Sequence, residues 1–151
     1  MLTVVLGPPA AGKSTWVLER AKPGDVVIDF DRLAVALTGP GGDPHDHPAH
    51  VVTVTMAART AAIDAALALI ATVQVYVIHT SPNAGDMAHY RLLGADIVTI
   101  NPGHDVVRER VAAERPARMA SVAQQWYTGR RPRRPPKPPQ ASPSYSFPGT
   151  P

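Results

Sequence analysis

The stretch LTVVLGPPAAGKST, from Leu2 to Thr15, decides the fold of this 151-residue chain. It opens with the apolar run Leu2–Leu6, which predicts a short buried strand. Residues 7–14 then fit the pattern G-x-x-x-x-G-K-[S/T], and helical spacing over residues 13–21 follows. A phosphate-binding loop needs a strand before it and a helix after it, and this sequence predicts both.

The loop pattern predicts the binding of ATP together with Mg²⁺. Four residues between two glycines wrap the backbone so that its N–H groups point at one phosphate, and the helix N-terminus adds a positive dipole end. Lys13 places a cation at the β- and γ-phosphates, and Ser14 offers its hydroxyl to Mg²⁺. The predicted ATP-binding residues are Gly7, Pro8, Pro9, Ala10, Ala11, Gly12, Lys13, Ser14 and Thr15. The alternative is an accidental glycine-rich turn.

Three further apolar runs alternate with helical patterns along the chain. They predict strands over residues 25–29, 74–79 and 95–100. Helices are predicted over residues 31–37, 83–93, 106–114 and 117–127. A long helix after residue 50 carries one apolar stripe, made of Val52, Met56, Ile63, Leu67 and Ile70. Alternating strands and helices form right-handed βαβ units, so we expect an α/β fold with a parallel sheet covered on both faces.

The composition excludes several kinds of site. The chain has no cysteine, which rules out a disulfide scaffold, a cysteine zinc site, an iron–sulfur cluster and a thiol nucleophile. No apolar run reaches 18 residues, and no basic leader precedes the first strand. We therefore expect a cytoplasmic protein with no membrane partner, and a monomer.

The net charge of +3 divides unevenly along the chain. Residues 129–151 hold five basic side chains, no acidic one and eight of the 17 prolines, whereas residues 1–128 have a net charge of −2. We expect a nucleotide-binding, kinase-like domain over 1–128 and a disordered, basic, proline-rich tail over 129–151. The tail could contact nucleic acid weakly, dock a proline-recognising groove, or only improve solubility.

Two carboxylates follow the second predicted strand, at Asp29 and Asp31. Both should emerge at the carboxyl edge of the sheet, where open α/β folds bind ligands. One can hold a water of Mg²⁺, which we assign to Asp29, and the other can take a proton from an attacking hydroxyl. The alternative is that Asp31 only caps a helix.

Four arginines lie within eleven positions after the last predicted strand: Arg108, Arg110, Arg115 and Arg118. Phosphoryl transfer spreads negative charge over the phosphate oxygens, so catalysis depends mainly on positioning and on cations. We expect at least one of these arginines to act on phosphate, first Arg115, because it adjoins the break at Pro116. The alternative is a solvated helix face on which Glu109 and Glu114 pair with the arginines.

The segments GPPAAGKSTW (7–16), VIDFDRL (27–33), RERVAAERP (108–116) and QQWY (124–127) together resemble the small P-loop kinases related to phage polynucleotide kinase. The placement of the two aspartates is also similar to that in shikimate- and gluconate-type kinases. The resemblance implies a three-layer fold with a sheet of four or five strands and a mobile, arginine-bearing lid. It implies that Lys13 and Ser14 hold ATP and Mg²⁺, that Asp31 is the general base, and that Arg110 or Arg115 supplies the lid charge.

The third predicted strand departs from this family, because it ends in His79 where relatives generally carry aspartate. Mg²⁺ favours hard oxygen donors, so a neutral histidine is a poor substitute. Three consequences stay open: Asp29 takes over the metal role, metal use is weak, or activity has been lost.

A polar loop at His45, Asp46, His47 and His50 suggests a metal site. We favour a mobile loop near the acceptor pocket, because nothing in the loop sequence implies ligand geometry. Asp43 and Arg59 are weaker candidates for the same pocket.

These patterns predict an ATP-dependent phosphotransferase that acts on a hydroxyl of a nucleotide, a nucleoside or a nucleic-acid 5′ end. The second hypothesis is a non-catalytic or slow NTP-binding accessory protein, recruited to nucleic acid or to a partner by its tail. The third is simple NTP hydrolysis.

Overall fold

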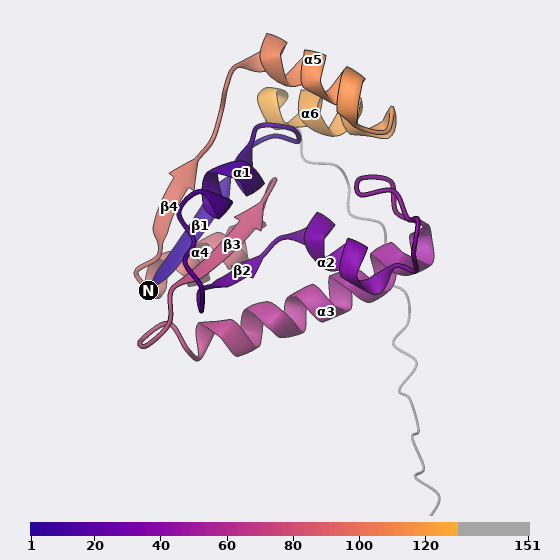
Figure 1. Cartoon of the computed structure of the whole chain (residues 1–151). Helices are drawn as coiled ribbons and strands as arrows, with labels where there is room; N and C mark the ends of the chain where they lie inside the picture. The colour runs from indigo at the N-terminus through magenta and orange to yellow at the C-terminus, as the bar shows by residue number, and fades with distance from the viewer. Residues whose placement is uncertain (130–151) are drawn as a thin grey trace, which may run out of the picture.

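Four parallel strands form the centre of the molecule in the computed structural model, which describes residues 1–129 (Figure 1). The strands are β1 (Leu2–Leu6), β2 (Val26–Ile28), β3 (Val75–His79) and β4 (Asp96–Thr99). Their order across the sheet is β2-β3-β1-β4, so β1 lies between β3 and β4. The predicted fold class is therefore confirmed: the domain is an α/β fold with an all-parallel sheet.

The pleat of the two central strands separates two apolar cores. Val4 pairs with Val77, and both point into a core that also contains Ala66 and Tyr90. Val5 and Ile78 point to the other face, where they pack with Val17 and Trp16. Successive side chains of a strand alternate between faces, so continuous runs of valine and isoleucine are what a sheet covered on both faces requires.

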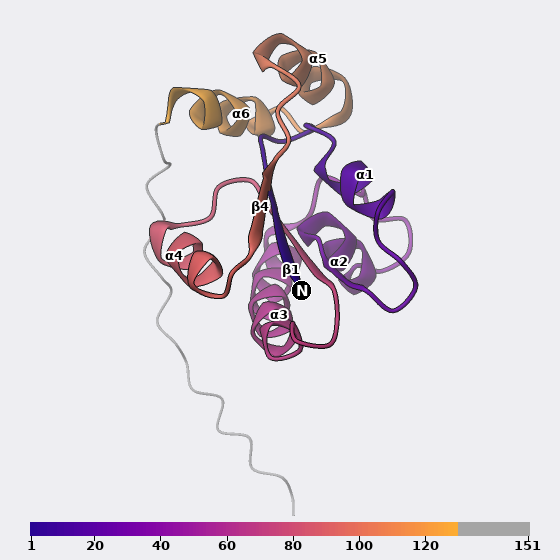
Figure 2. The same cartoon turned by 90° about the vertical axis from the view of Figure 1, so that its left-hand side faces the viewer.

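Helices cover both faces of this sheet. The helices are α1 (Lys13–Leu18), α2 (Phe30–Leu37), α3 (Ala49–Leu67), α4 (Ala84–Leu92), α5 (His104–Glu114) and α6 (Arg118–Thr128). Helices α1 and α4 lie on opposite faces (Figure 2). Helices α5 and α6 lie together beyond the ends of the strands, above the loop that leaves β1 (Figure 1).

The predicted apolar stripe of α3 was wrong at Met56, which is 48% exposed. The helix instead buries Val51, Thr55 and Ala66, and it ends at Leu67, so that Ile70 packs on the core from the following turn. Apolar residues occur on several sides of α3, and periodicity alone therefore could not choose the buried face. Helix α1 is also shorter than predicted and ends at Leu18.

The basic tail predicted over 129–151 lies outside the described residues, except for Gly129, which caps α6. Within residues 1–129, no helix combines the length and the apolar character needed to cross a membrane.

Candidate functional site

A cavity of about 1020 Å³ opens at the carboxyl ends of the strands. The loop after β1, the start of α2, the end of β3 and the helices α5 and α6 all contribute to its walls. Most of the predicted site residues line it: Pro9, Ala10, Ala11, Gly12, Lys13, Ser14, Thr15, Asp29, Asp31, Arg110 and Arg115. Gly7 and Pro8 do not, because Gly7 packs against the backbone of Ile100 and Pro8 is fully buried.

Two glycines with positive φ shape the loop between β1 and α1 (residues 7–12). Gly12 has a φ of 91° and Gly7 a φ of 150°, values that favour glycine. Lys13 Nζ donates to the carbonyls of Gly7 (2.9 Å) and Pro8 (2.7 Å), which holds the ammonium over the loop. Burial lowers the pKa of Lys13 to about 8, against the opposing effect of the Asp29 carboxylate. An anion bound in the loop would favour the charged form of this lysine.

Asp29 joins the loop to the start of α2. Its Oδ2 accepts a hydrogen bond from the hydroxyl of Ser14, and its Oδ1 accepts one from the backbone N–H of Asp31 at 3.1 Å. Asp29, not Asp31, is therefore the N-cap of α2, which corrects the alternative that placed the cap at Asp31. The helix begins at Phe30, so the residue that fits the cap position is the one just before it.

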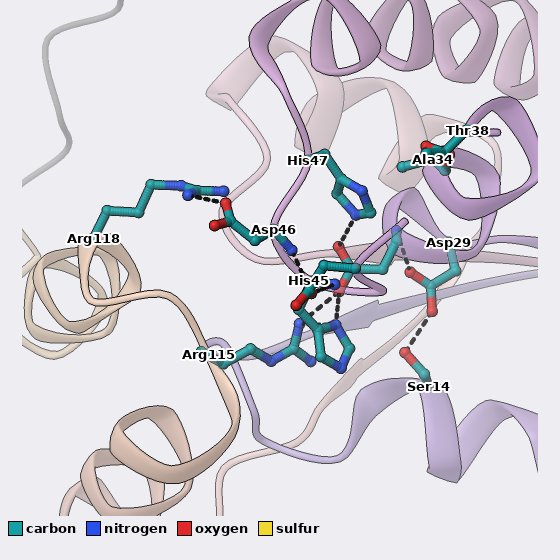
Figure 3. Close-up of polar contacts among 11 residues, drawn as sticks. Ser14, Asp29, Ala34, Thr38, His45, Asp46, His47, Arg115 and Arg118 are labelled. Carbon is teal, nitrogen blue, oxygen red and sulfur yellow. Dashed lines mark hydrogen bonds and ion pairs between the residues drawn. The ribbon is translucent and has the colours of Figure 1, made fainter. Parts of the chain in front are cut away.

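Asp31 contacts three side chains, those of His45, His47 and Arg115, which Figure 3 labels. Its Oδ2 accepts a hydrogen bond from Arg115 Nη1 at 2.6 Å and lies 3.0 Å from His45 Nδ1. Its Oδ1 lies 3.8 Å from Nε2 of His47. The structure thus brings together the predicted base and the predicted lid arginine, which are 84 positions apart in the chain.

The four arginines of the predicted lid, α5 with α6, do not share one environment. Arg110 Nη1 donates to the carbonyl of Ala10 at 3.4 Å, which places its cation at the phosphate loop. Arg118 pairs with Asp46 at the rim. Arg108 does not line the cavity and, among residues 1–129, forms an ion pair with Asp105, at 3.4 Å.

The end of β3 carries a neutral imidazole. His79 Nε2 lies 2.9 Å from the hydroxyl oxygen of Tyr90. Burial and the nearby Arg59 guanidinium lower the pKa of His79 to about 4, so the ring is uncharged at neutral pH. Arg59 reaches the same strand end through a hydrogen bond from Nη2 to the carbonyl of Ile78 at 2.7 Å. The end of β3 therefore supplies no carboxylate to the site, and the carboxylate beside Ser14 is that of Asp29.

The histidine loop places His45 and His47 beside Asp31, whereas His50 is exposed and outside the cavity. Within residues 1–129, no group of three or more histidine and acidic side chains is arranged to hold a metal ion. Sequence reasoning missed that His47 is buried. It also missed three apolar residues that line the cavity, Leu18, Val35 and Val52. The sequence pattern of α1, α2 and α3 does not distinguish them from the apolar residues that pack on the core.

No protein-family model matches this chain, and no curated protein sequence matches it. The parallel sheet in the order β2-β3-β1-β4 is consistent with P-loop nucleoside triphosphatases but is not specific to them. The class that fold and site define is therefore an α/β domain with a phosphate-loop motif.

Proposed function

We propose that this domain is an ATP-dependent phosphotransferase similar to the polynucleotide-kinase-like group of P-loop kinases. One observation carries the proposal: Lys13 of the loop, Asp31 after β2 and Arg115 of the lid line the same cavity. A cation for the phosphates, a carboxylate for the acceptor proton and a movable arginine are the groups that phosphoryl transfer needs.

The residues present fit a complex of ATP with Mg²⁺. Ser14 and Asp29 already face each other, so the serine hydroxyl and a carboxylate-held water would be the protein's contribution to the metal. Mg²⁺ bound there would neutralise charge on the β- and γ-phosphates. The backbone of residues 7–15, Lys13 and Arg110 would hold the phosphates themselves.

Asp31 would take the proton of the acceptor hydroxyl. In the present arrangement Arg115 pairs with one oxygen of that carboxylate. When a triphosphate enters, its charge competes for the guanidinium, and Arg115 would move from Asp31 to the phosphate oxygens. That exchange would free the base and place a cation on the transferred group in one motion.

The size and lining of the cavity support a nucleoside-containing acceptor. A volume of about 1020 Å³ is at the upper end for a single-ligand pocket, which typically measures about 300–1,000 Å³. Leu18, Val35 and Val52 give the lining of the cavity apolar surface on which a base or sugar can pack. The basic residues of the tail would add weak, salt-dependent contact when the acceptor is a nucleic-acid 5′ end.

The test is transfer of label from γ-labelled ATP to a panel of nucleosides, nucleotides and 5′-hydroxyl oligonucleotides. We expect transfer by the full chain, and none by Lys13→Ala or Asp31→Asn. If no acceptor receives label in a Lys13-dependent manner, the phosphotransferase proposal is wrong.

A second candidate function is NTP binding without turnover. The neutral His79 at the end of β3 and the pairing of Asp31 with Arg115 favour it. It predicts ATP binding by the wild-type chain with no transfer and no hydrolysis, and weaker association with nucleic acid once residues 130–151 are removed. A turnover near 1 s⁻¹, at the lower end of the range of about 1–100 s⁻¹ for kinases, would exclude it.

A further inference from the structure

A buried histidine beside the proposed base lacks a hydrogen-bond partner. The side chain of His47 is 3% exposed, and within residues 1–129 neither of its ring nitrogens is hydrogen-bonded. Buried polar groups in proteins are nearly always hydrogen-bonded, and an exception calls for an explanation. Because His47 lines the cavity, a ligand in that cavity can supply the missing partner.

The two oxygens of Asp31 have different surroundings. Oδ2 is engaged by Arg115 and His45, at 2.6 and 3.0 Å. Oδ1 receives no hydrogen bond from the described part of the chain and lies 3.8 Å from His47 Nε2, which is too far for a direct hydrogen bond. In Figure 3, His47 lies on one side of the cluster, and His45 with Arg115 lies on the other. The oxygen that remains available to an acceptor is therefore the one next to His47.

Neighbouring residues hold the ring of His47 in place. Phe30, the first residue of α2, packs edge-on against it, with ring centroids 6.0 Å apart and planes at 66°. Pro48 follows His47 and is the N-cap of α3, so the backbone of His47 is restricted as well. Because both its ring and its backbone are restricted, His47 can orient a ligand without first losing conformational freedom.

We propose that His47 positions the acceptor hydroxyl against Asp31, an inference that rests on the phosphotransferase function proposed above. The 3.8 Å between Asp31 Oδ1 and His47 Nε2 is compatible with one oxygen atom about 2.8 Å from each of them, which a small shift of the buried ring toward the cavity would admit. The acceptor hydroxyl donates its proton to Oδ1 and accepts a hydrogen bond from the Nε2–H of His47. This gives the hydroxyl a defined direction, which the carboxylate alone does not.

The acceptor oxygen forms a bond to the γ-phosphorus of ATP, and its proton passes to Asp31. The bond between the γ-phosphorus and the bridging oxygen breaks, and ADP leaves with the electron pair. His47 keeps its own proton throughout, so it is an acceptor-positioning residue, while Asp31 is the base.

The test compares His47→Phe, His47→Gln and the matched control His50→Phe, in which the original histidine is exposed and three residues away. Using the acceptor that the wild-type chain labels, we expect kcat/KM for this acceptor to fall roughly 100-fold in His47→Phe, as for a misplaced reactant. His47→Gln, which keeps an N–H donor, should recover part of this loss. The Kd for ATP should stay unchanged in all three variants, and His50→Phe should transfer phosphate as the wild type does.

Thermal unfolding separates this role from a structural one. Phenylalanine removes buried, unpaired nitrogens, so His47→Phe should unfold at no lower temperature than the wild type. Unchanged acceptor kinetics in His47→Phe would overturn the inference and leave the phosphotransferase function standing. A loss of acceptor turnover accompanied by lower ATP affinity and a lower Tm would also overturn it. Absence of Lys13-dependent transfer in the wild type would overturn both proposals.

Discussion

Asp29 combines two roles that are often divided between residues. It caps α2 through the backbone N–H of Asp31, and it accepts a hydrogen bond from the hydroxyl of Ser14. The end of β3 supplies no carboxylate, because its side chain is the neutral His79. The carboxylate next to the loop serine is that of Asp29. Of the three consequences left open by the sequence, this geometry favours a metal role for Asp29.

The substitution Asp29→Asn separates the two roles. Asparagine caps a helix as well as aspartate does, so Tm should change little. The lost charge should weaken Mg²⁺-dependent ATP binding about 10- to 100-fold, a typical cost of removing a group that supports a metal. Titrations of ATP at several Mg²⁺ concentrations measure this effect, with Asp96→Asn on the exposed edge of β4 as the control. An unchanged Mg²⁺ requirement in Asp29→Asn would contradict the assignment.

If the domain binds ATP as proposed, Lys13 should make the affinity for ATP dependent on pH. In the free protein its pKa is lowered to about 8, and bound phosphates would raise that pKa again. Binding should therefore take up a proton above pH 8, and ATP affinity should fall as the pH rises above that value, by at most about tenfold per unit. Calorimetry in buffers with different ionisation enthalpies measures the proton uptake. Lys13→Gln should bind ATP weakly and with a flat profile, and a flat wild-type profile would contradict this account.

At the scale of elements, the entry to the phosphate loop depends on close packing between β1 and the segment after β4. A Cβ built on Gly7 would lie 2.2 Å from the carbonyl oxygen of Ile100, and the φ of Gly7 is 150°. No side chain fits there, so glycine is required both by conformation and by contact.

Gly7→Ala should therefore destabilise the fold. The unfavourable backbone alone costs about 1–3 kcal/mol, and the clash with Ile100 adds to it. Gly39→Ala is the matched control, because no atom lies within 4 Å of its Cβ position, and it should change stability by less than about 0.5 kcal/mol. Urea denaturation of the two variants gives the comparison, and equal stability would show that the contact is not needed.

At the scale of the whole molecule, the helix pair α5 and α6, the predicted lid, has an apolar cluster of its own. Its core consists of Val107, Val111 and Ala123, with Ala10 of the loop packed against them. Polar contacts also join α5 and α6 to the rest of the domain. Among them are the ion pair of Arg115 with Asp31 and the hydrogen bond from Trp126 Nε1 to the carbonyl of Thr80. Units with small apolar cores and few contacts to the rest of a domain open more readily than a central sheet.

Hydrogen exchange tests this division. Without nucleotide, backbone amides of α5 and α6 should exchange faster than those of β1 and β3. ATP with Mg²⁺ should slow exchange in α5 and α6 more than in the sheet, because the phosphates would bind Arg110 and Arg115. Equal protection of the lid and the sheet in the free protein would contradict a lid that moves independently.

The sequence alone determined the features that are encoded locally. A valine-rich run, a glycine-bounded loop and a helix follow one another within the first 18 residues, so their identity did not depend on distant contacts. The alternation of strands and helices, which predicts the parallel sheet, is also visible in local sequence patterns. The position of the two aspartates just after β2 is visible there too. Even there, the local pattern placed the helix cap two residues too late.

Only the tertiary structure decided which distant groups meet. The pairing of Asp31 with Arg115, the burial of His47 and the neutrality of His79 arise when the loop before α3, the end of β3 and the lid converge on one cavity. Tertiary packing also decided which face of α3 is buried. Apolar residues lie on several sides of this helix, and packing against the sheet selects one of those sides. Local patterns specify elements through backbone geometry, whereas burial and charge pairing depend on contacts between residues far apart in the chain.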